Sequence, residues 1–193
     1  MDRLEHNAIW ATASARVAGV RLRPTTLGQW RLLEAAASPF AWGGRASADA
    51  VRVALEIVSQ PWRRTARRMR SPRLFALRCW VRHLWADASD AARLRSWLDQ
   101  QWASPPRYRE RGRSPSEAYP PCCGPADRLA MRALAAGVPA LAPSGARTVW
   151  DATVAEALWA CVCRDELAGA EYQPRGEAEE LERRRRAARR GAR

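Results

Sequence analysis

The segment "RLRPTTLGQWRLLEAAASPFAWGG", residues 21–44, decides the fold class predicted for this chain. A threonine just before an apolar-periodic run is a typical helix N-cap, so Thr25 or Thr26 is expected to begin a helix. The apolar residues of this run fall on one helical face: Leu27, Trp30, Leu33 and Ala37. Pro39 ends the run, and Gly43–Gly44 provide a turn. A capped helix that ends in a break and a turn favours an all-α architecture.

The same pattern continues as far as residue 102. Ser47 is expected to cap a helix over 48–60, and its apolar stripe is Val51, Ala54, Leu55 and Val58. Ser71 as cap and Pro72 at the first helical position predict another helix. We interpret its large apolar residues as a core-facing stripe: Leu74, Leu77, Trp80, Val81, Leu84 and Trp85. A further helix over 89–102 would bury Leu94, Trp97, Leu98 and Trp102.

Changes in composition along the sequence divide the chain into five segments. No segment shows the alternation of apolar and polar residues that would predict a β-strand of useful length. Residues 103–125, "ASPPRYRERGRSPSEAYPPCCGP", are too rich in proline, serine and arginine for a helix or a central strand. The predicted organisation is an irregular multi-helix domain with this order: 1–20 N-terminal lead-in, 21–102 helical core, 103–125 Pro/Ser/Arg-rich linker, 126–172 C-terminal helices of the same domain, and 173–193 charged C-terminal helix or tail.

Two helices are expected after the linker. The first covers 126–137. The second is predicted as one continuous helix over 147–172, "RTVWDATVAEALWACVCRDELAGAEY". Its buried side would carry Val149, Val154, Ala157, Leu158 and Cys161.

The length and the net charge of the chain limit its domain count and the kinds of partner it can bind. At 193 residues the chain suits one domain with a real core. All 33 basic residues are arginine, as expected from a GC-rich bacterial or phage genome, and the net charge is +13. Codon bias replaces lysine by arginine without creating charge, so the excess indicates an anionic partner such as nucleic acid, a membrane surface or an acidic protein.

The N-terminal residues lack the basic-then-apolar layout of a secretory signal. The best apolar run, around 149–162, contains Asp151 and Glu156, which argues against a membrane span. We therefore expect the protein to be cytoplasmic in the bacterial host cell and to have no membrane among its partners.

No residue pattern predicts an enzyme, a metal or a cofactor. Cys122–Cys123 and the pair Cys161 and Cys163 lack the two-residue spacing that structural zinc sites favour, so packing roles are preferred. Cys79 and His83 are four residues apart, but no loop that would donate to an oxyanion accompanies them. The expectation is a non-enzymatic protein with no catalytic residue and no cofactor.

The strongest chemical signal is a basic segment that begins with "WRRTARRMR". Its arginines would neutralise several phosphates or face an acidic partner: Arg63, Arg64, Arg67, Arg68, Arg70 and Arg73. The competing interpretation is a solvated surface, because no helix-turn-helix or zinc-finger pattern would direct a helix to base edges. The arginine-rich tail allows the same two interpretations.

Tryptophan is the other unusual residue, with ten in the chain. Trp30, Trp80, Trp85 and Trp97 fit helix faces that point into a core. The remaining candidates fall at or near helix ends, where an amphipathic ring often anchors a partner: Trp42, Trp62 and Trp102.

The opening segment resembles a block in small α-helical proteins encoded in phage and prophage tail modules, the tail assembly chaperones. In that block an Arg/Leu-Pro-Leu-Thr-Leu-Gly entry leads into a helix with Leu-Leu-Glu, which is followed by a Ser-Pro-Phe break and a glycine-rich turn. The matching residues are Pro24, Leu27, Gly28, Leu32, Leu33, Glu34, Ser38, Pro39 and Phe40. A later match is Trp150, at the start of a Trp-led penultimate helix.

The resemblance covers about a quarter of the chain, and it rests on caps and core positions. It implies an accessory protein that binds the long helical tape measure protein and keeps it soluble while tail tube subunits assemble. Apolar faces of its helices would cover apolar stripes of that client, and self-association is a further expectation. The alternative from the residues alone is a nucleic-acid-binding protein that acts through its arginine-rich segments.

Overall fold

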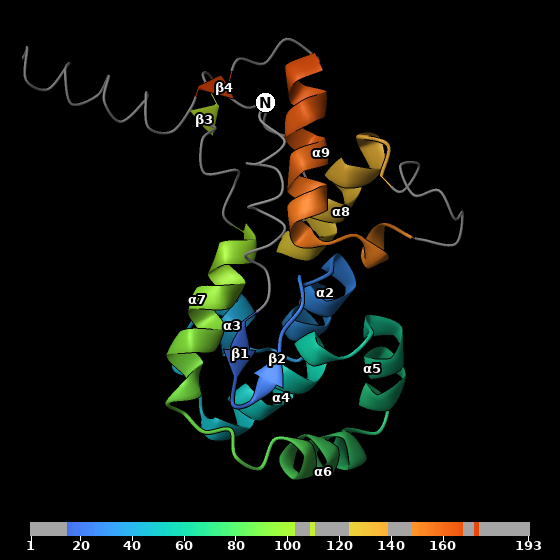
Figure 1. Cartoon of the computed structure of the whole chain (residues 1–193). Coiled ribbons are helices and arrows are strands. Elements are labelled where there is room, and N and C mark those ends of the chain that lie inside the picture. Colours follow the sequence, from blue (N-terminus) through green and yellow to red (C-terminus); the bar gives the residue numbers. More distant parts are fainter. Residues whose placement is uncertain (1–14, 103–108, 111–123, 139–147, 168–171, 174–193) are drawn as a thin grey trace, which may run out of the picture.

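The protein is described by a computed structural model, which covers residues 15–102, 109–110, 124–138, 148–167 and 172–173. This part of the chain is mostly helical, which confirms the all-α prediction (Figure 1). The helices are α2 (Leu27–Ala35), α3 (Pro39–Trp42), α4 (Ala48–Ser59), α5 (Trp62–Met69), α6 (Pro72–Arg82), α7 (Asp90–Trp102), α8 (Pro125–Ala135), the 3₁₀ helix η1 (Val149–Asp151) and α9 (Val154–Leu167). Two short antiparallel pairs complete it, β1 (Arg16–Val17) with β2 (Val20–Arg21) and β3 (Arg109–Glu110) with β4 (Tyr172–Gln173).

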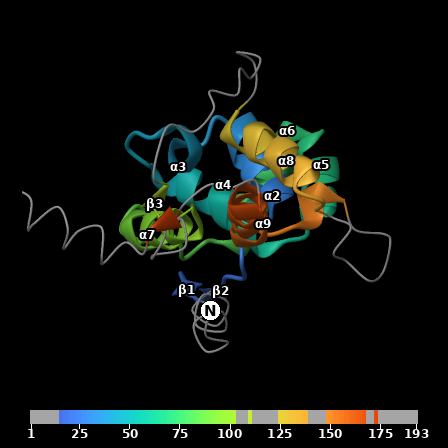
Figure 2. The same cartoon turned by 90° about the horizontal axis from the view of Figure 1, so that it is seen from above.

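Helix α2 lies at the centre, between the α4–α7 layer and the α8–α9 pair (Figures 1 and 2). Thr26 caps it, with a capping box in which its hydroxyl accepts from the Gln29 backbone and the Gln29 side chain accepts from the Thr26 backbone. The Gln29 amide also donates to the carbonyls of Val58 (3.0 Å) and Gln60 (2.8 Å). One buried side chain of α2 thus satisfies carbonyl groups at the C-terminal end of α4.

Two further residues of α2 fix its other neighbours. The Glu34 carboxylate accepts from the Ala126 backbone amide at 2.9 Å and so satisfies a free donor at the start of α8. Gly28 lies under Trp62 of α5, and a Cβ placed there would come within 2.5 Å of the indole ring. The glycine is therefore required by the close approach of α5 to α2.

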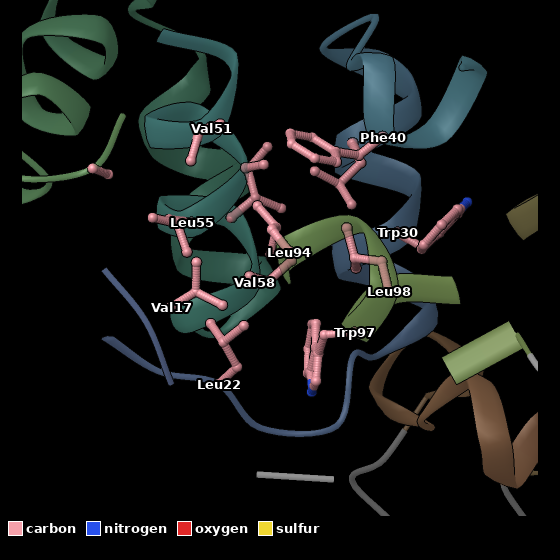
Figure 3. Close-up of a cluster of buried hydrophobic side chains, with 14 of the residues drawn as sticks. Val17, Leu22, Trp30, Phe40, Val51, Leu55, Val58, Leu94, Trp97 and Leu98 are labelled. Carbon is pink, nitrogen blue, oxygen red and sulfur yellow. The ribbon is translucent and has the colours of Figure 1, made fainter. Parts of the chain in front are cut away.

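The first of two apolar cores fills the space between α2, α3, α4 and α7 (Figure 3). Its central residues are buried side chains at helical spacing: Trp30, Leu33, Phe40, Val51, Leu55, Val58, Leu94, Trp97 and Leu98. The stripes predicted for α4 and α7 are confirmed as core faces. Val17 of β1 also belongs to this core, so buried packing begins within the segment interpreted as a lead-in.

The second core joins Leu27 of α2 to α8, η1 and α9. The chain around Thr26 pairs with the chain around Thr153 through two backbone hydrogen bonds, Leu27 to Ala152 and Val154 to Thr25, both 2.9 Å. The prediction of one continuous helix over 147–172 is wrong, because this pairing holds the chain extended between η1 and α9. The new start at α9 has its own capping pair between Thr153 and Glu156.

Smaller differences concern helix starts and the terminal segments. Ser71 precedes α6, but its side chain makes no capping hydrogen bond. The helix α2 ends before Ala37, which adopts a left-handed conformation with φ of +48° and is exposed. Most of the 103–125 linker and the 173–193 tail lie outside the described residues, as do Cys122 and Cys123.

Candidate protein-binding surface: the outer face of α6

The position of α6 is set by one buried carboxylate on α4. Glu56 is fully buried, and four basic side chains of α5, α6 and the residue after α6 surround it. Its Oε1 accepts from Arg68 (3.3 Å) and Arg78 (3.1 Å), and its Oε2 lies 3.4 Å from Nε of Arg82 and 3.1 Å from Nε2 of His83. We call these five residues the Glu56 cluster. It ties α5 and α6 to α4 through charge-assisted hydrogen bonds.

The charge state of Glu56 follows from these contacts. Burial alone would raise the pKa of this carboxyl group, but the hydrogen bonds from His83 and Arg78 and the charge of Arg82 outweigh it and hold the pKa below its usual value. Glu56 is therefore ionised at neutral pH. One carboxylate faces three guanidinium groups, so the cluster retains excess positive charge.

The cluster turns the polar side of α6 inward and its large apolar side outward. Only Phe75 and Cys79 of α6 enter the core, beside the arginines that bind Glu56. The residues predicted as a core stripe are instead exposed by 45 to 87%: Leu74, Leu77, Trp80, Val81, Leu84 and Trp85. The prediction that Trp80 and Trp85 are core residues is therefore wrong, whereas Trp30 and Trp97 are buried as predicted.

We call these six exposed residues the outer face of α6; four lie on the helix, and Leu84 and Trp85 lie in the turn that follows it. Leu74, Leu77 and Val81 follow the 3-4 spacing of coiled-coil a and d positions, which places them in one row along α6. Trp80 flanks this row. Together the six side chains expose on the order of 700 Å² of apolar surface, close to the ~800 Å² that one partner contributes to a standard interface. This exposed apolar surface makes the outer face of α6 the candidate protein-binding surface.

The basic segment splits into two groups. Arg68 binds Glu56, and Arg63 binds Asp151 at 2.8 Å while its guanidinium lies over the Trp62 ring. The other four candidates are exposed and make no ion pair with any residue in the described part of the chain: Arg64, Arg67, Arg70 and Arg73. Arg70 and Arg73 lie at the N-terminal end of α6, whereas Arg64 and Arg67 lie on α5.

The three tryptophans predicted to bind a partner lie at three different helix ends. Trp42 is 59% exposed at the end of α3, and its indole donates to the Glu34 carbonyl at 3.1 Å. Trp62 donates to Asp151 at 2.7 Å and covers Gly28. Trp102 packs edge-on against Trp30 with ring centroids 5.0 Å apart. Trp62 and Trp102 thus serve contacts within the domain, and Trp42 alone of the three is exposed.

Cys79 on α6 and His83, the residue after α6, are both buried. Burial, assisted by the charge of Glu56, raises the pKa of Cys79 to about 12, so the thiol stays protonated. The His83 ring is held by Glu56. Among the residues that the structure describes, no group of three or more His, Cys, Asp or Glu is placed to hold a metal ion. None of the described helices is long and apolar enough to cross a membrane.

A second surface feature lies between α2, α8 and η1. It is a shallow pocket of about 380 Å³, lined mainly by Met131, Leu134, Val149 and Trp150. Arg31 crosses it, with its guanidinium 4.9 Å from the Trp150 ring centroid and 3.3 Å from Asp127. Arg31 and Asp127 are thus paired with each other across the pocket. The pocket is therefore a weaker candidate binding site than the outer face of α6.

Comparisons with protein-family models, with curated proteins and with solved structures find no match to this chain.

Proposed function

We propose that the protein is a non-enzymatic accessory protein that binds a helical protein client through the outer face of α6. The observation that carries this proposal is the row of Leu74, Leu77 and Val81 on α6, which is exposed although its spacing suits packing against another helix. The resemblance of the opening segment to phage tail assembly chaperones supplies a specific candidate client, the tape measure protein. Such a role needs neither a catalytic residue nor a cofactor.

The test begins with the DNA on either side of the gene. The proposal expects a long, helix-rich reading frame beside tail tube genes, and the product of that frame is then co-expressed with this protein. Leu77→Asp should abolish co-purification, because it places a charge in the middle of the apolar row. Leu134→Asp is the matched control, since Leu134 is similarly exposed on α8, at the other end of the molecule (Figure 1). Equal capture by both variants would refute the proposal.

A second candidate function, nucleic-acid binding, is supported by the four exposed arginines without an ion pair in the described residues. Its signature is an affinity for DNA whose logarithm falls linearly with the logarithm of the salt concentration. Replacement of Arg64, Arg67, Arg70 and Arg73 by Gln should then reduce DNA affinity strongly. Weak DNA binding that this substitution does not change would dismiss the candidate, as would gene neighbours drawn only from tail assembly.

A further inference from the structure

We propose that the outer face of α6 takes an acidic amphipathic helix of another protein, and not a second copy of this chain. This inference rests on the proposed function and specifies the chemistry of the client. It combines the shape of the apolar row with the charge of the surface around it.

The charge of the surface is one-sided. Residues 61–86, which form α5 and α6 with their flanks, contain eight arginines and no aspartate or glutamate. Glu56 and Asp151 bind Arg63, Arg68, Arg78 and Arg82 from outside this segment. The remaining four arginines are exposed, and two of them, Arg70 and Arg73, lie at the start of α6, which carries the apolar row.

Arg73 is the residue that places this charge against a docked helix. It lies seven residues before Trp80 and therefore occupies the same flanking position along the row. Arg70 lies in the turn just before α6. A helix packed on Leu74 and Leu77 would bring its own flanking positions within reach of both guanidinium groups, and carboxylates there would form charge-assisted pairs.

The same charge argues against the other occupants. A second copy whose α6 packed parallel to this one would bring the two groups of exposed arginines together, and like charges in an interface disfavour association. Duplex DNA presents mainly phosphates and the polar edges of bases. If DNA docked on this face, the row of leucine and valine side chains would have no apolar group to pack against. An anionic membrane would draw on basic residues along the polar side of α6, but Arg78 and Arg82 of that side are engaged by Glu56.

The test uses the full chain and two labelled synthetic peptides. Each peptide has three heptads with Leu at a and d. One carries Glu at e and g, and the other carries Arg there, so that like charges keep each peptide from pairing with itself. Fluorescence anisotropy should show that the acidic peptide binds at least about tenfold more tightly than the basic one, and that raising the salt concentration narrows the difference.

Two variants separate the apolar and the charged contributions. Leu77→Asp should weaken acidic-peptide binding by about tenfold or more. The double variant Arg70→Glu/Arg73→Glu alters only exposed residues and should reverse the preference toward the basic peptide. Leu134→Asp on α8 and Arg93→Glu on α7 are the matched controls, and both should bind as the wild type does.

Several results would overturn the inference. Equal affinity for the two peptides, or no binding of either, would reject the inference that the face takes an acidic helix. The proposed function would survive that result if the client were still captured and Leu77→Asp still abolished its capture. A dimer in sedimentation that Leu77→Asp dissociates would show that a second copy covers the face. Tighter, Leu77-dependent binding to phosphatidylglycerol vesicles or to a DNA duplex would assign the surface to lipid or nucleic acid instead.

Discussion

Replacement of Glu56 by glutamine tests whether the buried carboxylate holds α5 and α6 in place. The substitution keeps the shape of the side chain and one acceptor oxygen, so the bonds from Arg68 and Arg78 can persist in a weaker, neutral form. The new amide group faces Arg82, which is also a donor, and that contact is lost. Removing one member of a buried charged cluster typically costs ~3–5 kcal/mol.

The structure places the expected loss at the lower end of this range. Arg78 and Arg82 retain 38 and 41% of their side-chain exposure, so water can solvate them when the carboxylate is removed. Arg68 and His83 are more buried and have no such compensation. We therefore expect Glu56→Gln to reduce the free energy of unfolding by about 3 kcal/mol.

Urea denaturation followed by circular dichroism measures this loss. With a slope of ~2 kcal/mol per molar urea, the midpoint should fall by roughly 1.5 M. Asp49→Asn on the same helix is the control, because its ion pair with Arg52 is largely solvent-exposed on the carboxylate side and should contribute less than ~0.5 kcal/mol. Hydrogen exchange should accelerate in α6 first. A loss below ~1 kcal/mol, or exchange unchanged in α6, would refute a structural role for the cluster.

Four further predictions follow from single observations. The pKa of Glu56 in the folded protein lies below its ordinary value of 4.5, so ionised Glu56 contributes its full stabilisation of the fold above pH 4.5. This stabilisation is lost as the pH falls through the folded-state pKa. The stabilities of the wild type and Glu56→Gln should therefore converge only in acid. Gly28→Ala should reduce the free energy of unfolding by about 2 kcal/mol and so lower the urea midpoint by ~1 M, since the added methyl group overlaps Trp62. Ala37→Gly should raise stability by about 0.5 kcal/mol in the same assay, because alanine is strained at positive φ. A variant that keeps Cys79 as its only cysteine should resist a thiol reagent when folded and react when unfolded.

Local signals account for the parts of the fold that were predicted. The Thr26 cap, the apolar spacing of α4 and α7, and the glycines at 43–44 with positive φ each follow from rules that act within one helical turn. The split between η1 and α9 also had a local signal that the prediction missed. Thr148 with Asp151 and Thr153 with Glu156 are two successive capping pairs, which indicate two helix starts.

The orientation of α6 could not be predicted in this way. Its sequence has two apolar rows, a small one of Phe75 and Cys79 and a large one through Leu77 and Val81, and periodicity favours burying the larger. The orientation depends on Glu56 of α4, which lies 22 residues before its partner Arg78 in the sequence. A buried carboxylate within an apolar stripe requires basic partners, and only the side of α6 that carries Arg78 and Arg82 supplies them.

This arrangement places polar groups inside and apolar groups outside, and that inversion is the strongest argument for a binding role. Turning α6 over would take Leu74, Leu77 and Val81 out of water, but it would also expose Phe75 and Cys79. It would further leave the buried Glu56 without Arg78 and Arg82. Under the proposed function, Glu56 and its arginines keep the apolar row exposed for the client.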